Sequence, residues 1–319
     1  MNIKLNGARA AIVLILFACL VNVTQAQEAE TPTLAWNLKA GDELTVEFQQ
    51  TQNVLTRIDA RDRTLESELT LSVDWKVNGV AENGVATIEQ TIQRIRIRTG
   101  APGSEVKKVV DIDTGGESQP RGVSRDLLKS AKKLIGLTFE VEMAANGNVT
   151  SITPGANVAA ATDSLPETSA LRGLFTPANL KRLVDETSFA LPAKKLKAGD
   201  SWGDDSKISL TTADGRELPF ERAINSKVTS LEKAQAKIDS EIKLSQGAVP
   251  ASSQDATALT SPLELLSFTG SGKMVFDRSA GIVTASEVTS SMKTRAIYRT
   301  DQITTTIDSI NRMTVSRKK

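Results

Sequence analysis

The sequence predicts a mainly β protein of the α+β class, with long curved antiparallel sheets and a few covering helices from the middle of the chain. Three observations predict this fold. Apolar and polar residues alternate with a period of two over many segments, Asn-Gly and Asp-Gly pairs separate several of these segments, and helical periodicity is confined to the middle of the chain. We expect the sheets to form a duplicated β-meander or an open barrel.

The clearest strand runs from Leu65 to Val77, where most odd positions are apolar and even positions are polar or charged. One face of such a strand meets a core and the other meets water, as in antiparallel sheets. The same alternation predicts strands at 44–48, 139–143, 238–244, 282–298 and 302–315. The period shifts by one between Ile92 and Ile95, which predicts a β-bulge near Gln93 and Arg94.

Turn dipeptides are expected to join strands as hairpins, because Asn, Asp and Gly adopt a positive φ at low cost. Four of them separate strand-like segments: Asn78-Gly79, Asn83-Gly84, Asn146-Gly147 and Asp214-Gly215. A further hairpin is expected around Ala280-Gly281. These turns predict that strands adjacent in sequence are also neighbours in the sheet.

Helical periodicity predicts three helices in the middle of the chain. The first carries one apolar stripe, which consists of Leu127, Leu128, Ala131, Leu134 and Ile135. Ser124 is its expected N-cap and Gly136 its expected stop. The other two are expected to begin at Ser164, in a capping box, and at Thr176, before a proline.

One pentapeptide occurs twice, as residues 38–42 and again as residues 196–200, and each copy has a tryptophan nearby. The repeat predicts a first β-rich half with helices at 27–190 and a second β-rich half at 191–319, related by duplication. The alternative is chance recurrence of a common Gly-Asp turn before a strand. Identity between the two halves is slight outside the pentapeptide, so the sequence leaves both interpretations open.

The first 26 residues have the features of an export signal. Lys4 and Arg9 precede an apolar run of 12 residues, which is shorter than the roughly 20 residues needed to span a bilayer. Small residues before Ala26 predict cleavage after that residue. An alternative is acylation of Cys19, but the bulky Phe17 and the apolar residues that follow Cys19 disfavour it. The expected location is the periplasm or cell envelope, or secretion, with no transmembrane helix in the mature chain.

Composition excludes several classes of activity. The 319 residues contain no histidine and one cysteine, so Ser-His-Asp and Cys-His nucleophilic systems cannot form and His-Cys zinc sites are not expected. A net charge of +1 provides no overall field to attract nucleic acid. We therefore expect no catalytic residues, no cofactor and no nucleic-acid partner.

Several turns and strand starts resemble those of a family of exported proteins of unknown function in planctomycete-type bacteria. The segments that carry the resemblance are Leu38 with Gly41-Asp42, the central Gly199-Asp200-Ser201-Trp202, and the late hairpin with Gly270, Gly272, Phe276-Asp277 and Gly281. The resemblance covers most of the chain after the signal. It implies a β-rich fold and export, and it brings no established catalytic residues.

Arg94, Arg96 and Arg98 alternate along one predicted strand and therefore share one face. Such a row is a candidate site for an anionic polymer or a lipid headgroup. The alternative is a charged outer face that keeps the sheet soluble and is neutralised by acids such as Glu66, Glu68 and Asp74 on a neighbouring strand.

The sequence thus predicts an exported, non-enzymatic envelope protein with a binding or scaffolding role. A curved sheet covered by helices can hold a lipid or another apolar ligand, so the expected partner is a lipid or another envelope component. Two alternatives remain: an outer-membrane β-barrel, and a hydrolase that uses two carboxylates. The sequence does not determine the oligomeric state.

Overall fold

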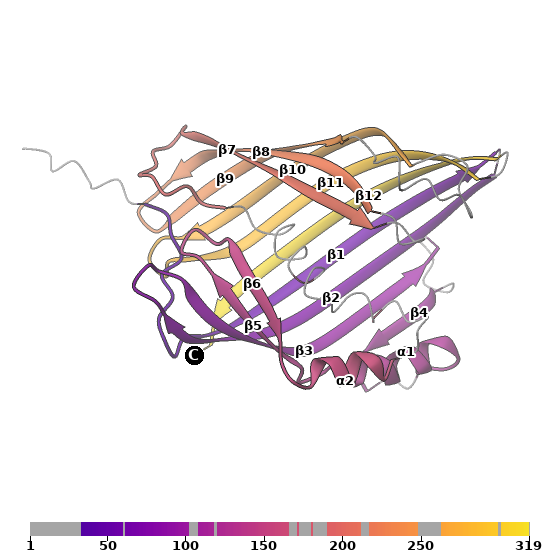
Figure 1. The fold of residues 1–319 in the computed structure, drawn as a ribbon, viewed down its shortest axis with the longest axis horizontal. Helices are drawn as coiled ribbons and strands as arrows, with labels where there is room; N and C mark the ends of the chain where they lie inside the picture. Colours follow the sequence, from indigo (N-terminus) through magenta and orange to yellow (C-terminus); the bar gives the residue numbers. More distant parts are fainter. Residues whose placement is uncertain are drawn as a thin grey trace, which may run out of the picture. The chain divides into compact units, whose positions relative to one another are not determined.

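One open antiparallel sheet of twelve strands dominates the computed structural model of the chain (Figure 1). The structure describes residues 33–59, 61–101, 108–117, 120–165, 171, 180, 190–211, 217–247, 263–298 and 301–318. The export signal predicted for residues 1–26, with Cys19 and Ala26, lies outside these residues. Within the described part, the mainly β class and the open antiparallel sheet are confirmed.

The elements follow one another as strands interrupted by two short helices. The strands are β1 (Glu43–Ile58), β2 (Arg61–Val80), β3 (Ala86–Gly100), β4 (Lys108–Asp113), β5 (Thr138–Met143), β6 (Val149–Pro154), β7 (Ser201–Thr211), β8 (Glu217–Leu231), β9 (Gln235–Gln246), β10 (Glu264–Asp277), β11 (Ile282–Tyr298) and β12 (Asp301–Arg317). The helices are α1 (Val123–Lys132) and α2 (Val158–Asp163).

The order of strands in the sheet is β6-β5-β3-β2-β1-β12-β11-β10-β9-β8-β7, with β4 paired to the other half of the β3 edge. All pairs are antiparallel, and most neighbours in space are also neighbours in sequence. The exceptions are β3, which pairs with β5 as well as β4, and the junction between the first and last strands. There β1 pairs with β12 from Leu44 opposite Arg317 to Ile58 opposite Ile303.

Two segments that cross one end of the sheet hold it in a curl. These crossing segments are residues 33–42 and 190–200. The backbone N–H of Trp36 donates to Ala145 O (2.7 Å) in the β5–β6 turn, and the backbone N–H of Asn37 donates to Gly281 O (2.8 Å) in the β10–β11 turn. In a flat sheet β5 and β11 would lie about 24 Å apart, because four strands separate them. Two consecutive residues can reach both turns only because the sheet curls around them.

The hydrophobic core fills the concave face at this crossed end. Alternate side chains of the strands point inward there, as Leu44, Val46 and Phe48 do from β1, and all three are buried. Leu34, Leu38 and Leu196 of the crossing segments pack into the same core. The rings of Trp36 and Trp75 lie 6.2 Å apart between centroids. Large aromatic side chains contribute much of the apolar area buried in such a core.

The predicted strands are confirmed, and β11 and β12 match the predicted ranges closely. The bulge is also confirmed, because Ser72 pairs with Arg94 and Val73 pairs with Ile92, which leaves Gln93 unpaired. Of the predicted turns, those at 83–84, 146–147 and 280–281 join β2 to β3, β5 to β6 and β10 to β11.

The turn predicted at Asn78-Gly79 is wrong. Strand β2 continues through it to Val80, and the pairing with β3 shifts there because Asn78 is an extra residue in the ladder. The real turn follows at 81–85, where Ala81 donates its N–H to Val85 O (2.9 Å). Two Asn-Gly pairs lie five residues apart, and a single hairpin needs one of them. The pair at 214–215 lies outside the described residues.

The predicted helix boundaries need correction. Helix α1 begins after Gly122, whose φ is 58°, rather than at Ser124, because the Ser124 hydroxyl accepts a hydrogen bond from Asp111 N (3.2 Å) on β4. Ser164 is the C-cap of α2, where its hydroxyl donates to Ala161 O (2.7 Å), and the residues that it is expected to cap in the next helix lie outside the described part of the chain. The helix predicted from Thr176 lies outside the described residues.

The two pentapeptide copies form the same turn. In each copy the aspartate side chain accepts a hydrogen bond of 2.8 Å from the backbone N–H of the lysine. The pairs are Lys39 with Asp42 and Lys197 with Asp200. In each copy the glycine has a φ near 90° and donates to a valine on the next strand. These are Gly41 to Val77 O and Gly199 to Val228 O, both 2.8 Å.

The matching turns support the interpretation of a duplicated meander. Each turn leads into a strand that pairs with its successor, β1 with β2 and β7 with β8, and the meanders run in the same sense along the sheet. The copies differ in their surroundings. Asp42 forms an ion pair with Arg317 of β12 at 2.5 Å, whereas Asp200 has no such arginine among the described residues. The halves share one sheet, and their boundary at 190–191 stays a prediction.

Replacing Gly281 with alanine is expected to destabilise the protein by roughly 3 kcal/mol. The new Cβ would lie 2.4 Å from Asn37 Cβ, and the φ of Gly281 is 64°. Gly79→Ala is the matched control, since a Cβ added at this position of β2 would meet nothing within 4 Å. Urea unfolding should show a change within about 0.5 kcal/mol for the control. Equal stabilities for the two variants would contradict the role given to the crossing segment.

The Asp42–Arg317 pair is expected to give a stability difference that depends on pH. Burial raises the pKa of Asp42, but hydrogen bonds from Arg317 and Lys39 N outweigh it, so the net pKa lies below the ordinary 3.8. The pair therefore stabilises the fold above pH 3.8 and is lost as pH falls through the lowered pKa. Asp42→Asn should cost about 1 kcal/mol more than Asp200→Asn at neutral pH.

Urea unfolding of both variants at neutral pH and at about pH 2 checks this expectation, because the difference between them should shrink as pH falls through the lowered pKa of Asp42. Asp200→Asn is a suitable control because it changes the same turn where no described arginine pairs with the aspartate. A difference between the two variants that is the same at both pH values would show that the arginine pair is not its cause.

Candidate functional site

Beyond the core, the concave face carries a belt of polar side chains that crosses the middle of the long strands. We define this polar belt as Gln50, Gln52, Ser226, Ser240, Ser290, Ser309 and Asn311. Its members pair across strands: Gln50 Nε2 donates to Asn311 Oδ1 (2.9 Å), and the hydroxyls of Ser290 and Ser309 lie 2.8 Å apart. The buried Ser226 and Ser240 hydroxyls are also 2.8 Å apart. Hydrogen bonds of this kind offset the cost of burying polar groups.

An apolar row follows the polar belt on the same concave face. It consists of Leu65, Val54, Ile307, Met292 and Phe268, contributed by β2, β1, β12, β11 and β10. Each member lies opposite the next in the register, so the row is continuous over five neighbouring strands. At a strand spacing of about 4.8 Å its length is about 19 Å.

The members of the apolar row are incompletely buried. Leu65 is 46% exposed, and the other four are half-buried. Among the described residues, Val54, Met292 and Ile307 also lie apart from the side chains that pack against the main core. Phe268 is the member of the row that packs against the core, so the row joins the core at β10 and is separate from it along the other four strands, with part of its surface still accessible.

Hydroxyl side chains border the apolar row on its far side. Thr56, Thr305 and Thr294 lie opposite one another on β1, β12 and β11, one inward position beyond the row. Ile58, Ile303 and Ala296 form the next inward position. The concave face thus alternates between polar and apolar bands along the strands. An elongated apolar ligand lying across the strands would meet the apolar row, with hydrogen-bonding groups on both sides.

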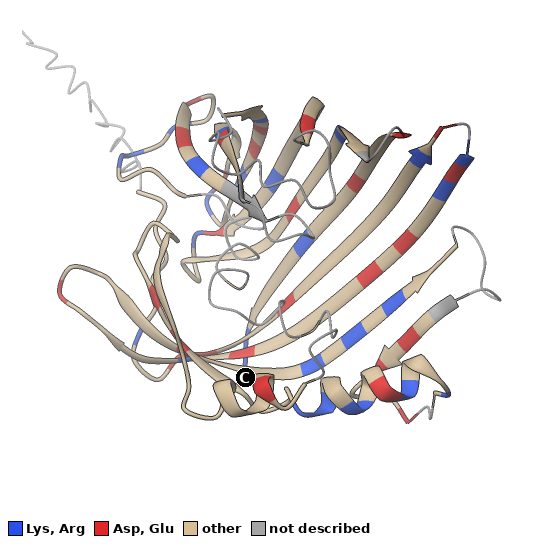
Figure 2. Ribbon diagram, turned by 45° about the vertical axis from the view of Figure 1, so that its right-hand side comes forward, with Lys and Arg blue, Asp and Glu red and all other residues tan. Residues whose placement is uncertain are grey.

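The predicted arginine row lies on the opposite, outer face of β3. Figure 2 shows its basic bands between acidic bands of β2 and β4. Arg94 forms a two-point ion pair with Asp113 of β4, with Nε–Oδ1 at 2.8 Å and Nη2–Oδ2 at 2.5 Å. Arg98 reaches Glu68 at 3.3 Å and Asp111 at 3.9 Å. Arg96 lies opposite Asp113 in the register.

These contacts show that carboxylates already hold two of the three arginines. The hydrogen bond from Arg94 lowers the pKa of Asp113, whereas burial raises it. The hydrogen bond from Gly115 N–H and the charges of Arg94 and Arg96 lower this pKa further. An anionic ligand would have to compete with Asp113 and Glu68. Glu68 neutralises Arg98, as the sequence predicted for the acids of the neighbouring strand. The sequence did not predict the contacts of Asp111 and Asp113, because these residues lie on β4, which follows β3 and pairs with its other edge. Anion binding at this row stays a prediction.

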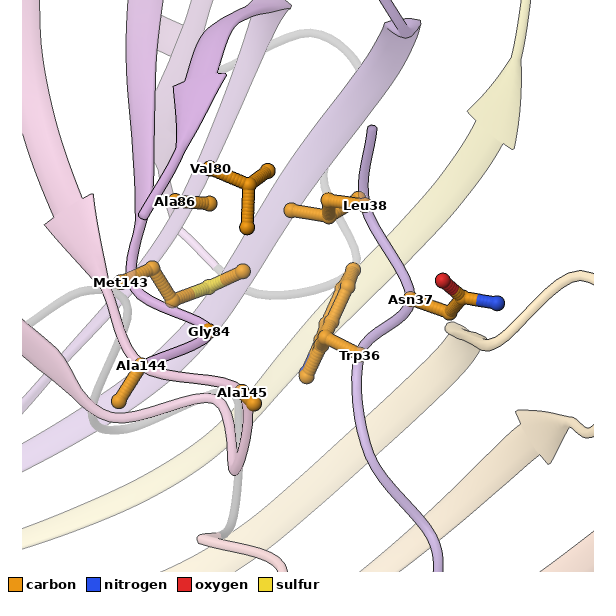
Figure 3. A pocket seen from close by; sticks show the side chains of 9 residues that line it. All are labelled: Trp36, Asn37, Leu38, Val80, Gly84, Ala86, Met143, Ala144 and Ala145. Carbon is orange, nitrogen blue, oxygen red and sulfur yellow. The ribbon is translucent and has the colours of Figure 1, made fainter. Parts of the chain in front are cut away.

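A small pocket of about 170 Å³ lies at the crossed end of the sheet (Figure 3). Trp36 and Leu38 of the crossing segment line it, together with Val80, Ala86 and Met143 from the facing strands. Its side chains are mainly apolar and include no titratable group. The pocket offers room for a small apolar group next to the core.

A shallower groove of about 470 Å³ lies on the outer face across β1, β12, β11 and β10. Its outward side chains are short: Thr51, Asn53, Thr269, Ser271, Thr289, Ser291, Asp308 and Ile310. Asp308 is the single carboxylate in this lining, whereas hydrolysis of a glycosidic bond commonly uses two. The short side chains keep the groove shallow, and most of them carry hydroxyl groups.

Two other features, a metal-binding cluster and a membrane-spanning helix, are absent from the described residues. No group of three or more Asp, Glu, Cys or His side chains there could hold a metal ion. Neither described helix is long and apolar enough to cross a membrane. The sequence did predict strands at 65–77 and 302–315, but no pattern in it indicated that Leu65, Val54, Met292 and Phe268 join Ile307 in one row.

Comparisons with known proteins give a family and several distant structural matches, including the two that follow. A family model described as a family of unknown function (DUF6263) matches residues 83–283, more than half of the chain. No curated protein matches the sequence. A lipovitellin chain, from a structure entitled "Lipid-protein interactions in lipovitellin", is 8% identical with a TM-score of 0.43, and the match covers 88% of this chain and 25% of that chain.

The second structural match is an outer membrane channel from Pseudomonas putida F1, which is 9% identical with a TM-score of 0.22. That match covers 89% of this chain and 99% of the channel. The present chain thus spans a quarter of the lipovitellin chain and nearly all of the channel. Neither TM-score reaches 0.5, so neither match supports an inference about this protein.

Replacing Arg94 with glutamine is expected to raise the pKa of Asp113 toward its ordinary value of 3.8, because the side-chain hydrogen bond is its largest lowering influence. Arg96→Gln is the matched control on the same face of β3, and it should raise that pKa less, since Arg96 acts through charge alone. Carboxyl NMR titration of Asp113 measures both changes. A larger rise for Arg96→Gln than for Arg94→Gln would contradict the pairing.

Proposed function

We propose that this chain, which belongs to the DUF6263 family of unknown function, is an exported, non-enzymatic envelope protein that holds an aliphatic chain against its concave face. The ligand class is an acyl chain of a lipid or fatty acid. The single observation that carries the proposal is the continuous, incompletely buried apolar row over five strands. The rest of the proposal follows from the surroundings of that row and from the residue inventory.

Burial of exposed apolar surface provides the driving force for such binding. A ligand contributes about 0.8 kcal/mol for each CH₂ group that it removes from water, and the row gains in the same way from covering its own side chains. Leu65, with 46% of its surface exposed, has the most to gain. A handful of buried CH₂ groups therefore suffices for measurable affinity, after the cost of immobilising the ligand.

The dimensions and composition of the row favour a single extended aliphatic chain. Its length of about 19 Å exceeds the roughly 15 Å that one lipid's chains occupy in half of a bilayer's hydrocarbon core. Four of its five side chains are aliphatic, and Phe268 is the single aromatic one. Sugar-binding surfaces favour aromatic platforms, so this composition supports an acyl chain rather than a glycan. The flanking hydroxyl and amide groups can accept the polar end of an amphiphile.

Two further parts of the proposal rest on the sequence. The apolar run of residues 10–21 after Lys4 and Arg9, with small residues before Ala26, supports export to the periplasm or cell envelope. The absence of histidine from the chain supports a binding role over catalysis by an imidazole base or by a nucleophile that histidine activates. A protein that binds an acyl chain needs an apolar surface and no reactive group.

Ile307→Gln is expected to weaken fatty-acid binding by about tenfold, because a polar amide would interrupt the middle of the apolar row. Ile310→Gln is the matched control: it lies three residues away on the same strand and faces the outer groove. Displacement of a fluorescent fatty acid by palmitate measures the affinity, and native mass spectrometry counts the bound chains. Circular dichroism verifies that both variants are folded.

Two results would refute the proposed function. One is purified wild-type protein that shows no adduct in native mass spectrometry and no displacement of the fluorescent fatty acid at any palmitate concentration tested. The other is an equal loss of binding in Ile307→Gln and Ile310→Gln, which would place the ligand away from the concave face.

A further inference from the structure

The edge strand β7 presents backbone groups that no strand pairs with among the described residues, although Ser201 O accepts a hydrogen bond from Lys194 Nζ (3.2 Å). Among the described residues, β7 pairs with β8 on one side and has no strand on the other. Exposed strand edges readily pair with another chain unless they are short, charged or blocked by proline. The opposite side of the sheet meets that description, because β4 and β6 have six residues each and β6 ends at Pro154. Strand β7 is longer and contains no proline, and its charged side chains, Asp204, Asp205 and Lys207, oppose pairing only with a strand that does not complement them.

The internal repeat shows what such an edge can accept. Strand β1 follows the first copy of the repeated turn, as β7 follows the second, and each pairs with the next strand in the chain. On its other side β1 pairs with β12 over fifteen residue pairs, from Leu44 to Ile58. The equivalent side of β7 therefore has a geometry that already takes an antiparallel strand once in this fold.

The charges of β7 complement those of a second β7 strand. Ser206 is the middle residue of Ser201–Thr211, so an antiparallel pair centred on it places Asp205 opposite Lys207 of the second copy, and Lys207 opposite its Asp205. Both side chains are exposed and lie on the same face of the strand. Neither forms an ion pair with another described residue, although Lys207 lies opposite Glu221 of β8 in the register. Opposite charges that face each other across strands are favourable.

From this edge, we infer that the protein forms a symmetric homodimer by antiparallel pairing of β7 with β7 of a second copy. The interface is the same strand in both copies, as twofold symmetry requires. Backbone hydrogen bonds supply the affinity and the two Asp205–Lys207 pairs fix the register. Residues that face each other across antiparallel strands point to the same side, so the two concave faces open on the same side of one continuous sheet.

Charge exchange at β7 tests the dimer. Sedimentation equilibrium of the purified wild-type protein is expected to show twice the monomer mass at high concentration. Asp205→Lys and Lys207→Asp each place like charges opposite each other, and each should weaken the dimer by at least about tenfold. A one-to-one mixture of these two variants should dimerise again, because each then faces its opposite. The double variant that exchanges both residues should dimerise as the wild type does.

Lys227→Asp is the matched control, since it reverses an exposed charge on β8, one strand inward from the edge, and should leave the mass unchanged. Circular dichroism verifies the fold of every variant. A monomeric wild type at all concentrations would overturn the inference, and so would a dimer that neither single charge reversal weakens. These measurements use no lipid, so their outcome is independent of the proposed ligand.

Discussion

The architecture depends on the hydrogen bonds by which two consecutive residues tie together turns from distant parts of the sheet. Trp36 binds the β5–β6 turn and Asn37 binds the β10–β11 turn, with four strands between β5 and β11. This constraint fixes the curl of the sheet, and the curl creates a concave face. Gly281 permits the close approach, since a side chain there would overlap Asn37. The core, the polar belt and the apolar row all lie on the face that this curl defines.

The concave face divides the work of stability and binding along the strands. At the crossed end, inward side chains such as Phe48 and Trp75 are buried and hold the fold together. The polar belt then interrupts the apolar surface with paired groups, of which Gln50 and Asn311 are one example. Beyond it the apolar row is incompletely covered. Hydrogen-bonded polar side chains separate most of the row from the core, and Phe268 is the member of the row that packs against the core.

Local patterns predicted most of the strands, because alternation of apolar and polar residues is a local consequence of one buried face. The same reasoning failed where a residue's role is set by a distant partner. Asn78-Gly79 looks like a hairpin turn, but β2 is held past it by pairing with β3. Ser124 looks like an N-cap, but its hydroxyl accepts a hydrogen bond from Asp111 N on β4. The apolar row combines residues from 54 to 307, and no local pattern gives the register that aligns them.

The bulge at Gln93 has a consequence for how this sheet can change during evolution. Before it, the inward residues of β3 have even numbers, and after it they have odd numbers, as Ile92 and Ile95 show. If β3 kept Gln93 but ran through it without the bulge, Ile95 and Ile97 would turn toward water and Arg96 and Arg98 would point into the protein. A single-residue insertion or deletion in β3 therefore keeps the inward face only where a bulge is gained or lost with it, as it would be on deletion of Gln93. The number of residues in this strand is therefore more constrained than the number in a loop, because it decides which side chains face the core.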